Sequence, residues 1–158
     1  MRQYKYYYRV SKYDPAFRNG GVFVKADWTS YADIGKAFEG HMLTLEDYLR
    51  VEKRYIQFIL DVIDACKGNK LRLVYLEASE DLLWRVGQTL SDNDLIGFWE
   101  DSMREKCWGQ LENDTLLMEP GYDFYVHIGC NLPLETVKCI AANNQLYAEL
   151  WEPFAAIE

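Results

Sequence analysis

Residues 44–66 read TLEDYLRVEKRYIQFILDVIDAC, and this stretch determines which fold the sequence predicts. Its apolar residues recur at intervals of three and four, with polar residues between them, as on one face of an α-helix. Thr44 suits the N-cap, and Gly68 suits a left-handed stop beyond the end. We expect one long helix at about 44–66, roughly 33 Å in length, which crosses the domain and supports a sheet. The apolar face consists of Leu45, Tyr48, Leu49, Tyr55, Ile56, Ile59, Leu60 and Ile63.

The remaining regular structure divides into strands and shorter helices. Strands are expected where apolar residues alternate with polar ones or fill both faces. They cover residues 4–11, 70–77, 108–113, 122–129 and 147–151, with a short strand or ordered loop at 22–24. Helices are expected where apolar spacing follows a capping residue. They cover residues 30–38 and 79–84, a segment from Ser91 or Asp92 to Met103, and residues 132–142 with Asn131 as the cap.

This order of elements predicts an α+β fold, a mixed sheet of about five strands with helices mainly on one face. The chain has 158 residues and shows no repeat or linker, so a single domain over residues 1–158 is expected. No apolar run approaches the about 18 residues that a membrane span needs, and the first residues lack the apolar core of a signal peptide. The sequence therefore predicts a cytoplasmic protein that does not contact membranes.

Patterns that encode cofactor and metal sites are missing from the sequence. It contains no P-loop, no dinucleotide-binding glycine motif and no nucleophile elbow. The two histidines, His41 and His127, are far apart, and no cysteine lies at ligand spacing from either of them. The cysteines form no Cys-x-x-Cys pair and are expected to be free thiols. They are Cys66, Cys107, Cys130 and Cys139. We therefore expect neither a metal nor a cofactor.

The charge of −8 is unevenly distributed along the chain. Residues 77–123 hold 12 acidic and 3 basic side chains, whereas residues 1–76 hold 13 basic and 9 acidic ones. Such an acidic block repels nucleic acid and attracts basic partners. Direct nucleic-acid binding is therefore disfavoured. The charge favours either a docking surface for a basic protein or simply an acidic exterior that keeps the protein in solution.

Asp123, Tyr125 and His127 alternate with apolar residues in the expected strand at 122–129. A strand places them on one face at steps of about 7 Å. A carboxylate, a phenol and an imidazole on one surface suit general acid–base catalysis, so a small metal-independent enzyme is one alternative. The other interpretation is the ordinary polar face of a half-buried strand.

Aromatic residues are concentrated in the first 31 positions. They suit either a surface that binds a small molecule or peptide, as in an adaptor domain, or the core and its rim. The residues are Tyr4, Tyr6, Tyr7, Tyr8, Tyr13, Trp28 and Tyr31.

Three segments carry a resemblance to a known group of proteins. They read SKYDPAFR at 11–18, WTSYADIG at 28–35 and YDFYVHIG at 122–129. In these segments the chain resembles small bacterial immunity proteins of polymorphic or contact-dependent toxin systems. The resemblance implies that the protein binds and neutralises a cognate toxin, often a nuclease, in the cytoplasm. It implies no catalytic residue.

The acidic block supplies the residues that we expect to bind such a toxin. Carboxylates provide charge complementary to a basic nuclease, and tryptophans provide desolvated anchors. The predicted partner-binding residues are Glu77, Glu80, Asp81, Asp92, Asp94, Trp99, Glu100, Asp101, Glu105 and Trp108, with Trp84, Glu112 and Asp114 as further members of the block. The sequence thus favours a binding protein over an enzyme.

Overall fold

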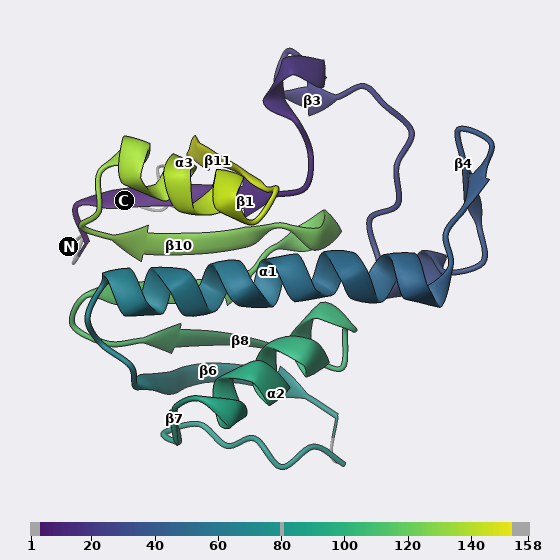
Figure 1. Cartoon of the computed structure of the whole chain (residues 1–158). Coiled ribbons are helices and arrows are strands. Elements are labelled where there is room, and N and C mark those ends of the chain that lie inside the picture. Colours follow the sequence, from purple (N-terminus) through teal and green to yellow (C-terminus); the bar gives the residue numbers. More distant parts are fainter. Residues whose placement is uncertain (1–3, 80, 153–158) are drawn as a thin grey trace.

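The computed structural model describes residues 4–79 and 81–152, which form an α+β fold (Figure 1). Within these residues one sheet has seven strands in the order β11-β1-β10-β9-β8-β6-β7, and every neighbouring pair is antiparallel. The α+β class is confirmed. The expected sheet of about five strands with mixed directions is wrong, because the sheet has seven strands and all of its pairs are antiparallel. The strands are β1 (Tyr6–Ser11), β6 (Leu71–Ala78), β7 (Thr89–Leu90), β8 (Cys107–Glu112), β9 (Leu116–Pro120), β10 (Val126–Cys130) and β11 (Tyr147–Leu150).

Two of the strands, β7 and β9, are absent from the sequence-based expectation. Four of the five residues of β9 are buried, so its sequence lacks the alternation of polar and apolar residues that marks a half-buried strand. Strand β7 has two residues and pairs with β6 only at Leu71 and Arg72. Neither segment has a sequence pattern that predicts a strand on its own, without knowledge of the strands that pair with it.

The segments before α1 and before β7 are less regular than expected. In place of a helix at 30–38, the chain forms a short 3-10 turn, η2 (Tyr31–Asp33), and then strand β4 (Ala37–Phe38). No helix forms between residues 81 and 88, because Trp84 lies against α2 instead, with its ring 5.8 Å from that of Phe98. The other short elements are η1 (Pro15–Phe17), β2 (Arg18–Asn19), β3 (Val22–Phe23), β5 (His41–Met42) and η3 (Tyr122–Phe124).

Helix α1 (Leu45–Ala65) has 21 residues and lies across the sheet (Figure 1). Thr44 caps it, accepting a hydrogen bond from the N–H of Asp47 at 3.1 Å. Leu49 is exposed, as is Leu45, because the first turns of α1 extend past the ends of the strands. The buried face is rotated about the helix axis relative to the expected one, because Ile56 and Leu60 are only half-buried whereas Glu52, Phe58 and Val62 are buried. It consists of Tyr48, Glu52, Tyr55, Phe58, Ile59, Val62 and Ile63.

The predicted end of α1 needs a correction. The left-handed residue is Lys67, with φ 56°, whereas Gly68 has no positive φ. Gly68 serves a different purpose: a Cβ there would lie 2.7 Å from Nδ2 of Asn113, which donates hydrogen bonds to the carbonyls of Gly68 and Lys70. The absence of a side chain lets the loop after α1 approach the turn after β8.

Helices α2 (Asn93–Met103) and α3 (Leu134–Asn143) cover the same face of the sheet as α1 (Figure 1). Two of the predicted caps do not act as caps. Asp92 occupies the N-cap position of α2, but its side chain makes no capping hydrogen bond. Asn131 accepts a hydrogen bond from the backbone N–H of Lys5 at 2.9 Å, and Pro133 takes the N-cap position of α3.

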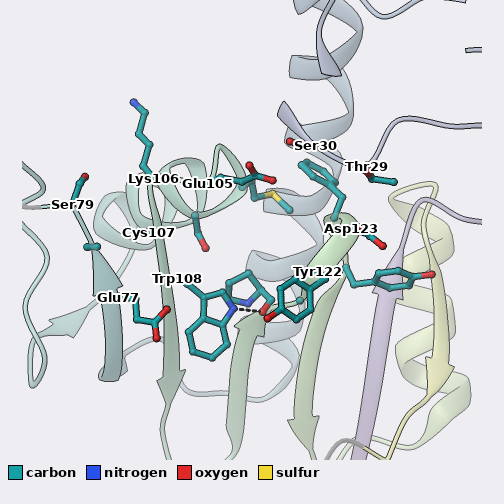
Figure 2. Close-up of a pocket in the computed structure, with 17 residues that line it drawn as sticks. Thr29, Ser30, Glu77, Ser79, Glu105, Lys106, Cys107, Trp108, Tyr122 and Asp123 are labelled. Carbon is teal, nitrogen blue, oxygen red and sulfur yellow. Dashed lines mark hydrogen bonds between the residues drawn. The ribbon is translucent and has the colours of Figure 1, made fainter. Parts of the chain in front are cut away.

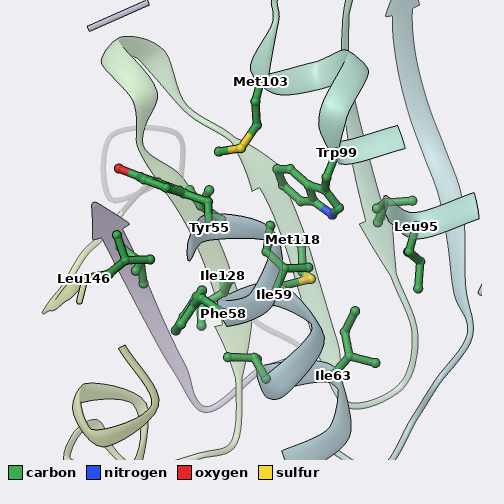
Figure 3. Packing of buried hydrophobic residues seen from close by; sticks show 14 of the residues in the cluster. Tyr55, Phe58, Ile59, Ile63, Leu95, Trp99, Met103, Met118, Ile128 and Leu146 are labelled. Carbon is green, nitrogen blue, oxygen red and sulfur yellow. The ribbon is translucent and has the colours of Figure 1, made fainter. Parts of the chain in front are cut away.

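The core lies between the three helices and the sheet. Figure 3 shows Phe58 and Ile59 of α1 packed beside Met118 of β9 and Ile128 of β10, with Trp99 of α2 nearby. The four cysteines are free thiols.

Four of the seven N-terminal aromatic residues are buried in the core and are not available to line a ligand-binding surface. Tyr4, Tyr8, Tyr13 and Trp28 are all at most 7% exposed. The buried hydroxyl groups donate to backbone carbonyls, for example from Tyr8 to Leu132 at 2.6 Å. This satisfies the polar end of each ring inside the protein.

Candidate functional site

A cleft of about 630 Å³ lies at one end of the sheet (Figure 2). Its walls come from the end of β6, the end of α2, the start of β8 and the connection between β9 and β10, and Thr29 and Ser30 complete it. Its volume falls within the range of about 300–1,000 Å³ that is typical of ligand sites.

The charged groups of the cleft are mainly acidic. Glu77, Glu105 and Asp123 contribute carboxylates, and Lys106 contributes the only ammonium group among the lining residues. Within the part of the chain that the structure describes, none of the three carboxylates forms an ion pair. Glu77 accepts a hydrogen bond of 2.5 Å from the hydroxyl of Tyr75, and this bond raises the pKa of Tyr75. The cleft therefore carries a negative charge that its own residues do not neutralise.

Glu105 is placed at the cleft by the way in which α2 ends. It adopts the left-handed conformation, with φ 63°, just beyond the helix. Its N–H donates to the carbonyl of Ser102 at 3.1 Å, and the N–H of Lys106 donates to that of Asp101 at 2.9 Å. Glycine is the residue that best fits this position of a helix end. The glutamate therefore occupies a conformation that costs it free energy.

Asp123 is held by a second left-handed segment. Asp123 and Phe124 have φ of 57° and 67°, and such a conformation is strongly disfavoured for a bulky residue like phenylalanine. The ring of Phe124 is buried, 4.8 Å from the ring of Tyr55 and 4.9 Å from that of Trp28. Tyr13 donates from its hydroxyl to the carbonyl of Asp123 at 2.7 Å. These contacts hold the Asp123 backbone at the cleft.

Aromatic side chains border the acidic groups. Trp108 is 36% exposed, and its indole N–H donates to the carbonyl of Pro120 at 2.8 Å. Tyr122 is 93% exposed, which is unusual for so large a ring. Figure 2 shows Trp108 and Tyr122 along one side of the cleft and Glu105 and Lys106 along another.

Ser102 is the lining residue with an unsatisfied polar group. It is 5% exposed, and its Oγ has no hydrogen-bond partner among the described residues. A buried hydroxyl without a partner costs free energy, unless something outside the chain supplies one.

Three of the predicted partner-binding residues, Glu77, Glu105 and Trp108, line this cleft. The structure keeps Trp99 away from any partner, because it is 1% exposed in the core beneath α2. Its expected role as a surface anchor is therefore wrong. Glu80 lies outside the described residues.

The other predicted residues are spread along α2 and the loop before it. Asp92 and Asp94 are exposed at the start of α2, and Asp81 is exposed in the loop. Asp101 accepts a hydrogen bond of 2.9 Å from the indole N–H of Trp84, and Glu100 pairs with Arg104 at 3.4 Å. The cleft therefore brings together only Glu77, Glu105 and Trp108, and the other described members of the predicted site lie outside it.

The strand face expected for Asp123, Tyr125 and His127 is interrupted. Strand β10 begins only at Val126, and Asp123 belongs to η3. The hydroxyl of Tyr125 accepts a hydrogen bond from Nη2 of Arg18 at 2.6 Å.

His127 does not line the cleft and has partners of its own. Its ring stacks on Trp151 with 3.6 Å between centroids, and its Nδ1 is 3.9 Å from Glu119. The three residues therefore do not share one regular face. Among residues 4–79 and 81–152, no group of three or more His, Cys, Asp or Glu side chains is arranged to hold a metal ion.

Sequence reasoning missed Ser102, Lys106 and Tyr122 as parts of the site. Ser102 and Tyr122 join it only because the end of α2 and the β9–β10 connection meet in space, and no local pattern reports that meeting. A weak signal existed at Pro120-Gly121, directly before Tyr122, because a Pro-Gly dipeptide is typical of a turn.

Comparisons with protein-family models, with curated proteins and with solved structures give no match for the chain. In the described part of the chain, no helix is both long enough and apolar enough to cross a membrane.

Proposed function

We propose that the protein is a cytoplasmic immunity-type protein, which binds and neutralises a cognate basic toxin through the acidic surface of residues 77–123. The observation that carries the proposal is that most carboxylates of the predicted site have no ion-pair partner within the described residues. Among the described members of the predicted site, only Glu100 forms an ion pair, and its partner Arg104 lies on the same helix. The acidic block is thus left free to attract another molecule.

Three basic residues near the N-terminus pair with carboxylates outside the acidic block. Arg9 and Arg18 both contact the carboxylate of Glu149, each at 3.1 Å, and Lys12 contacts that of Asp27 at 2.8 Å. Unpaired carboxylates on one region of a surface speed the encounter with a positively charged protein and orient it. A nuclease whose cationic groove binds nucleic acid would be inhibited when this surface covers the groove.

Charge reversal tests the proposal against a matched control. The variant Asp94→Lys/Glu105→Lys should slow association with the toxin encoded beside this protein and flatten its dependence on salt. The control Asp64→Lys/Glu135→Lys changes net charge equally at exposed sites outside the acidic block and should have a much smaller effect. Equal association rates for the two variants at low salt would remove the acidic block from the interface. Failure of the wild type to bind or neutralise the toxin would refute the function itself.

One observation favours a second function, a binding domain for a small cationic ligand. The cleft has the volume of a ligand site and an excess of carboxylates, and it exposes aromatic rings. Binding of a small organic cation in a metabolic setting, without any toxin partner, would favour this alternative.

A further inference from the structure

We propose that the cleft at the end of α2 is a receptor for a guanidinium group, supplied by an arginine side chain of the partner. The identity of the partner rests on the proposed function, whereas the chemistry of the cleft stands on its own residues. The inference assigns to Glu77, Glu105, Asp123, Ser102, Trp108 and Tyr122 a shared task, the binding of one planar cation.

The first argument is that the cleft has a net negative charge and that two of its carboxylates have no partner within the described residues. Three carboxylates and one ammonium line the cleft, and within the described residues neither Glu105 nor Asp123 makes a side-chain hydrogen bond or an ion pair. The C-terminal end of α2, an eleven-residue helix, adds its partial negative charge to the same region. A cation entering the cleft therefore meets attraction from side chains and backbone together.

The second argument is the hydroxyl of Ser102. It lines the cleft, is almost completely buried and has no hydrogen-bond partner among the described residues. Its oxygen can accept an N–H from a ligand that binds in the cleft against Ser102. This observation is independent of the carboxylates, and it indicates a ligand that donates hydrogen bonds.

The third argument distinguishes arginine from lysine. A guanidinium is planar, presents five N–H donors, stacks on aromatic rings and is less strongly hydrated than an ammonium. Trp108 and Tyr122 expose rings beside the carboxylates, so stacking and charge-assisted hydrogen bonding are offered together (Figure 2). A compact ammonium would use the charge but leave the rings and several acceptors unused.

The test uses a small probe, so that it does not depend on the toxin. Nα-acetyl-arginine amide is titrated into the ¹⁵N-labelled protein, and the indole N–H of Trp108 serves as a local reporter that Trp108→Phe identifies. We expect saturable shifts at Trp108 and at the amides of Ser102 and Glu105. Nα-acetyl-lysine amide, which keeps its ammonium group, should bind about fivefold more weakly. The uncharged Nα-acetyl-citrulline amide should give no saturable shift.

Four variants locate the binding. Asp123→Asn keeps a side chain that tolerates the left-handed conformation, so it removes charge without new strain. It and Glu105→Gln should each weaken arginine binding about tenfold, and Ser102→Ala about threefold. Asp64→Asn, at an exposed position of α1 outside the acidic block, should leave binding unchanged.

The outcomes separate this inference from the proposed function. No saturable shift, or equal binding of the arginine and citrulline probes, overturns the guanidinium site, even if the toxin still binds. Equal weakening by Asp64→Asn and Asp123→Asn would also overturn it, because binding would then follow net charge alone. If the probe binds as expected and the toxin does not, the site stands and the immunity function falls.

Discussion

Arg104, at the C-cap of α2, donates two hydrogen bonds to the buried carboxylate of Glu52 on α1, from Nε at 2.9 Å and from Nη2 at 2.7 Å. Glu52 is 3% exposed and lies on the core face of α1, one turn after Tyr48. The bonds raise the pKa of Arg104 above its ordinary value. This pair joins the longest helix to the helix that borders the cleft.

Removing the guanidinium should therefore destabilise the protein strongly. In Arg104→Met the Glu52 carboxylate is left buried without its partner, and we expect a loss of about 3–5 kcal/mol in the free energy of unfolding, measured by urea denaturation. The double variant Glu52→Leu/Arg104→Met removes both charges and should recover most of this loss. A single variant within about 1 kcal/mol of the wild type would show that the pair is not sealed from water.

Lys12 should give the stability a distinctive dependence on pH. Its Nζ lies 4.1 Å from the centre of the Trp28 ring and 4.4 Å from that of Tyr13, and it contacts Asp27. Burial lowers the pKa of Lys12 from 10.5 to about 8. Between these values the unfolded chain keeps the proton on Lys12 that the folded protein has lost, so the contribution of Lys12 to stability rises with pH. Burial also raises the pKa of the Cys107 thiol to about 12, which lowers stability over the same interval, so the gain of roughly 2 kcal/mol from pH 8 to 10 is expected in the difference between the wild type and a variant without Lys12.

The variant Lys12→Met supplies the control for this prediction. It keeps an unbranched side chain between the rings and removes the titrating amine, so urea denaturation of both proteins isolates the contribution of Lys12 over the same interval. Burial raises the pKa of Tyr4 and Tyr8 to about 12, so the unfolded chain loses their protons first and both proteins lose stability together as the pH passes 10. A difference in stability between the two proteins that stays constant from pH 8 to 10 would contradict the lowered pKa of Lys12.

Local signals in the sequence were sufficient for elements whose cause is local. Thr44 caps α1 through an N–H three residues away, and Tyr8 and Val10 alternate with half-buried residues in β1. Burial that depends on distant partners could not be predicted. Position 52 lies on the helix face that the apolar spacing marks, but only Arg104, 52 residues later, makes a carboxylate tolerable there.

The site was predictable only in part for a related reason. Charge counting located Glu77, Glu105 and Trp108 in the acidic block, because a block of like charge is visible without a structure. The left-handed backbone at Asp123 was not visible, since it depends on Phe124 reaching Trp28 and Tyr55. The alternation of polar and apolar residues predicted a strand that includes residues 122–125. The burial of the Phe124 ring imposes a left-handed backbone there instead, and β10 begins only at Val126.

Two glycines near α2 should respond oppositely to alanine. A Cβ on Gly109 of β8 would lie 2.9 Å from the carbonyl oxygen of Tyr75 and 3.0 Å from the ring of Phe98, so Gly109→Ala should cost about 1–3 kcal/mol. A Cβ on Gly97, inside α2, would meet Trp84 at an ordinary 3.6 Å. Gly97→Ala should therefore stabilise by about 0.5–1 kcal/mol. Thermal unfolding of both variants checks the pair, and equal signs would contradict the packing of α2 on β8.

Glu105 should show a conflict between stability and binding. Glycine adopts its left-handed conformation at no steric cost, so Glu105→Gly should raise the free energy of unfolding by about 1 kcal/mol. Because the change also removes a carboxylate from the cleft, it should weaken binding of the arginine probe about tenfold.

Gln145 provides a matched control at the end of α3. It has φ 58°, and the same two backbone hydrogen bonds close that helix, from Gln145 to Ala142 at 3.0 Å and from Leu146 to Ala141 at 2.8 Å. Gln145→Gly should stabilise the protein to a similar extent and leave probe binding unchanged, since it lies outside the cleft. Stabilisation by both variants, with loss of binding in Glu105→Gly alone, would mean that the strained glutamate is retained for recognition. If Glu105→Gly kept full affinity, the carboxylate would have no part in the site, and the strain at the end of α2 would need a structural cause.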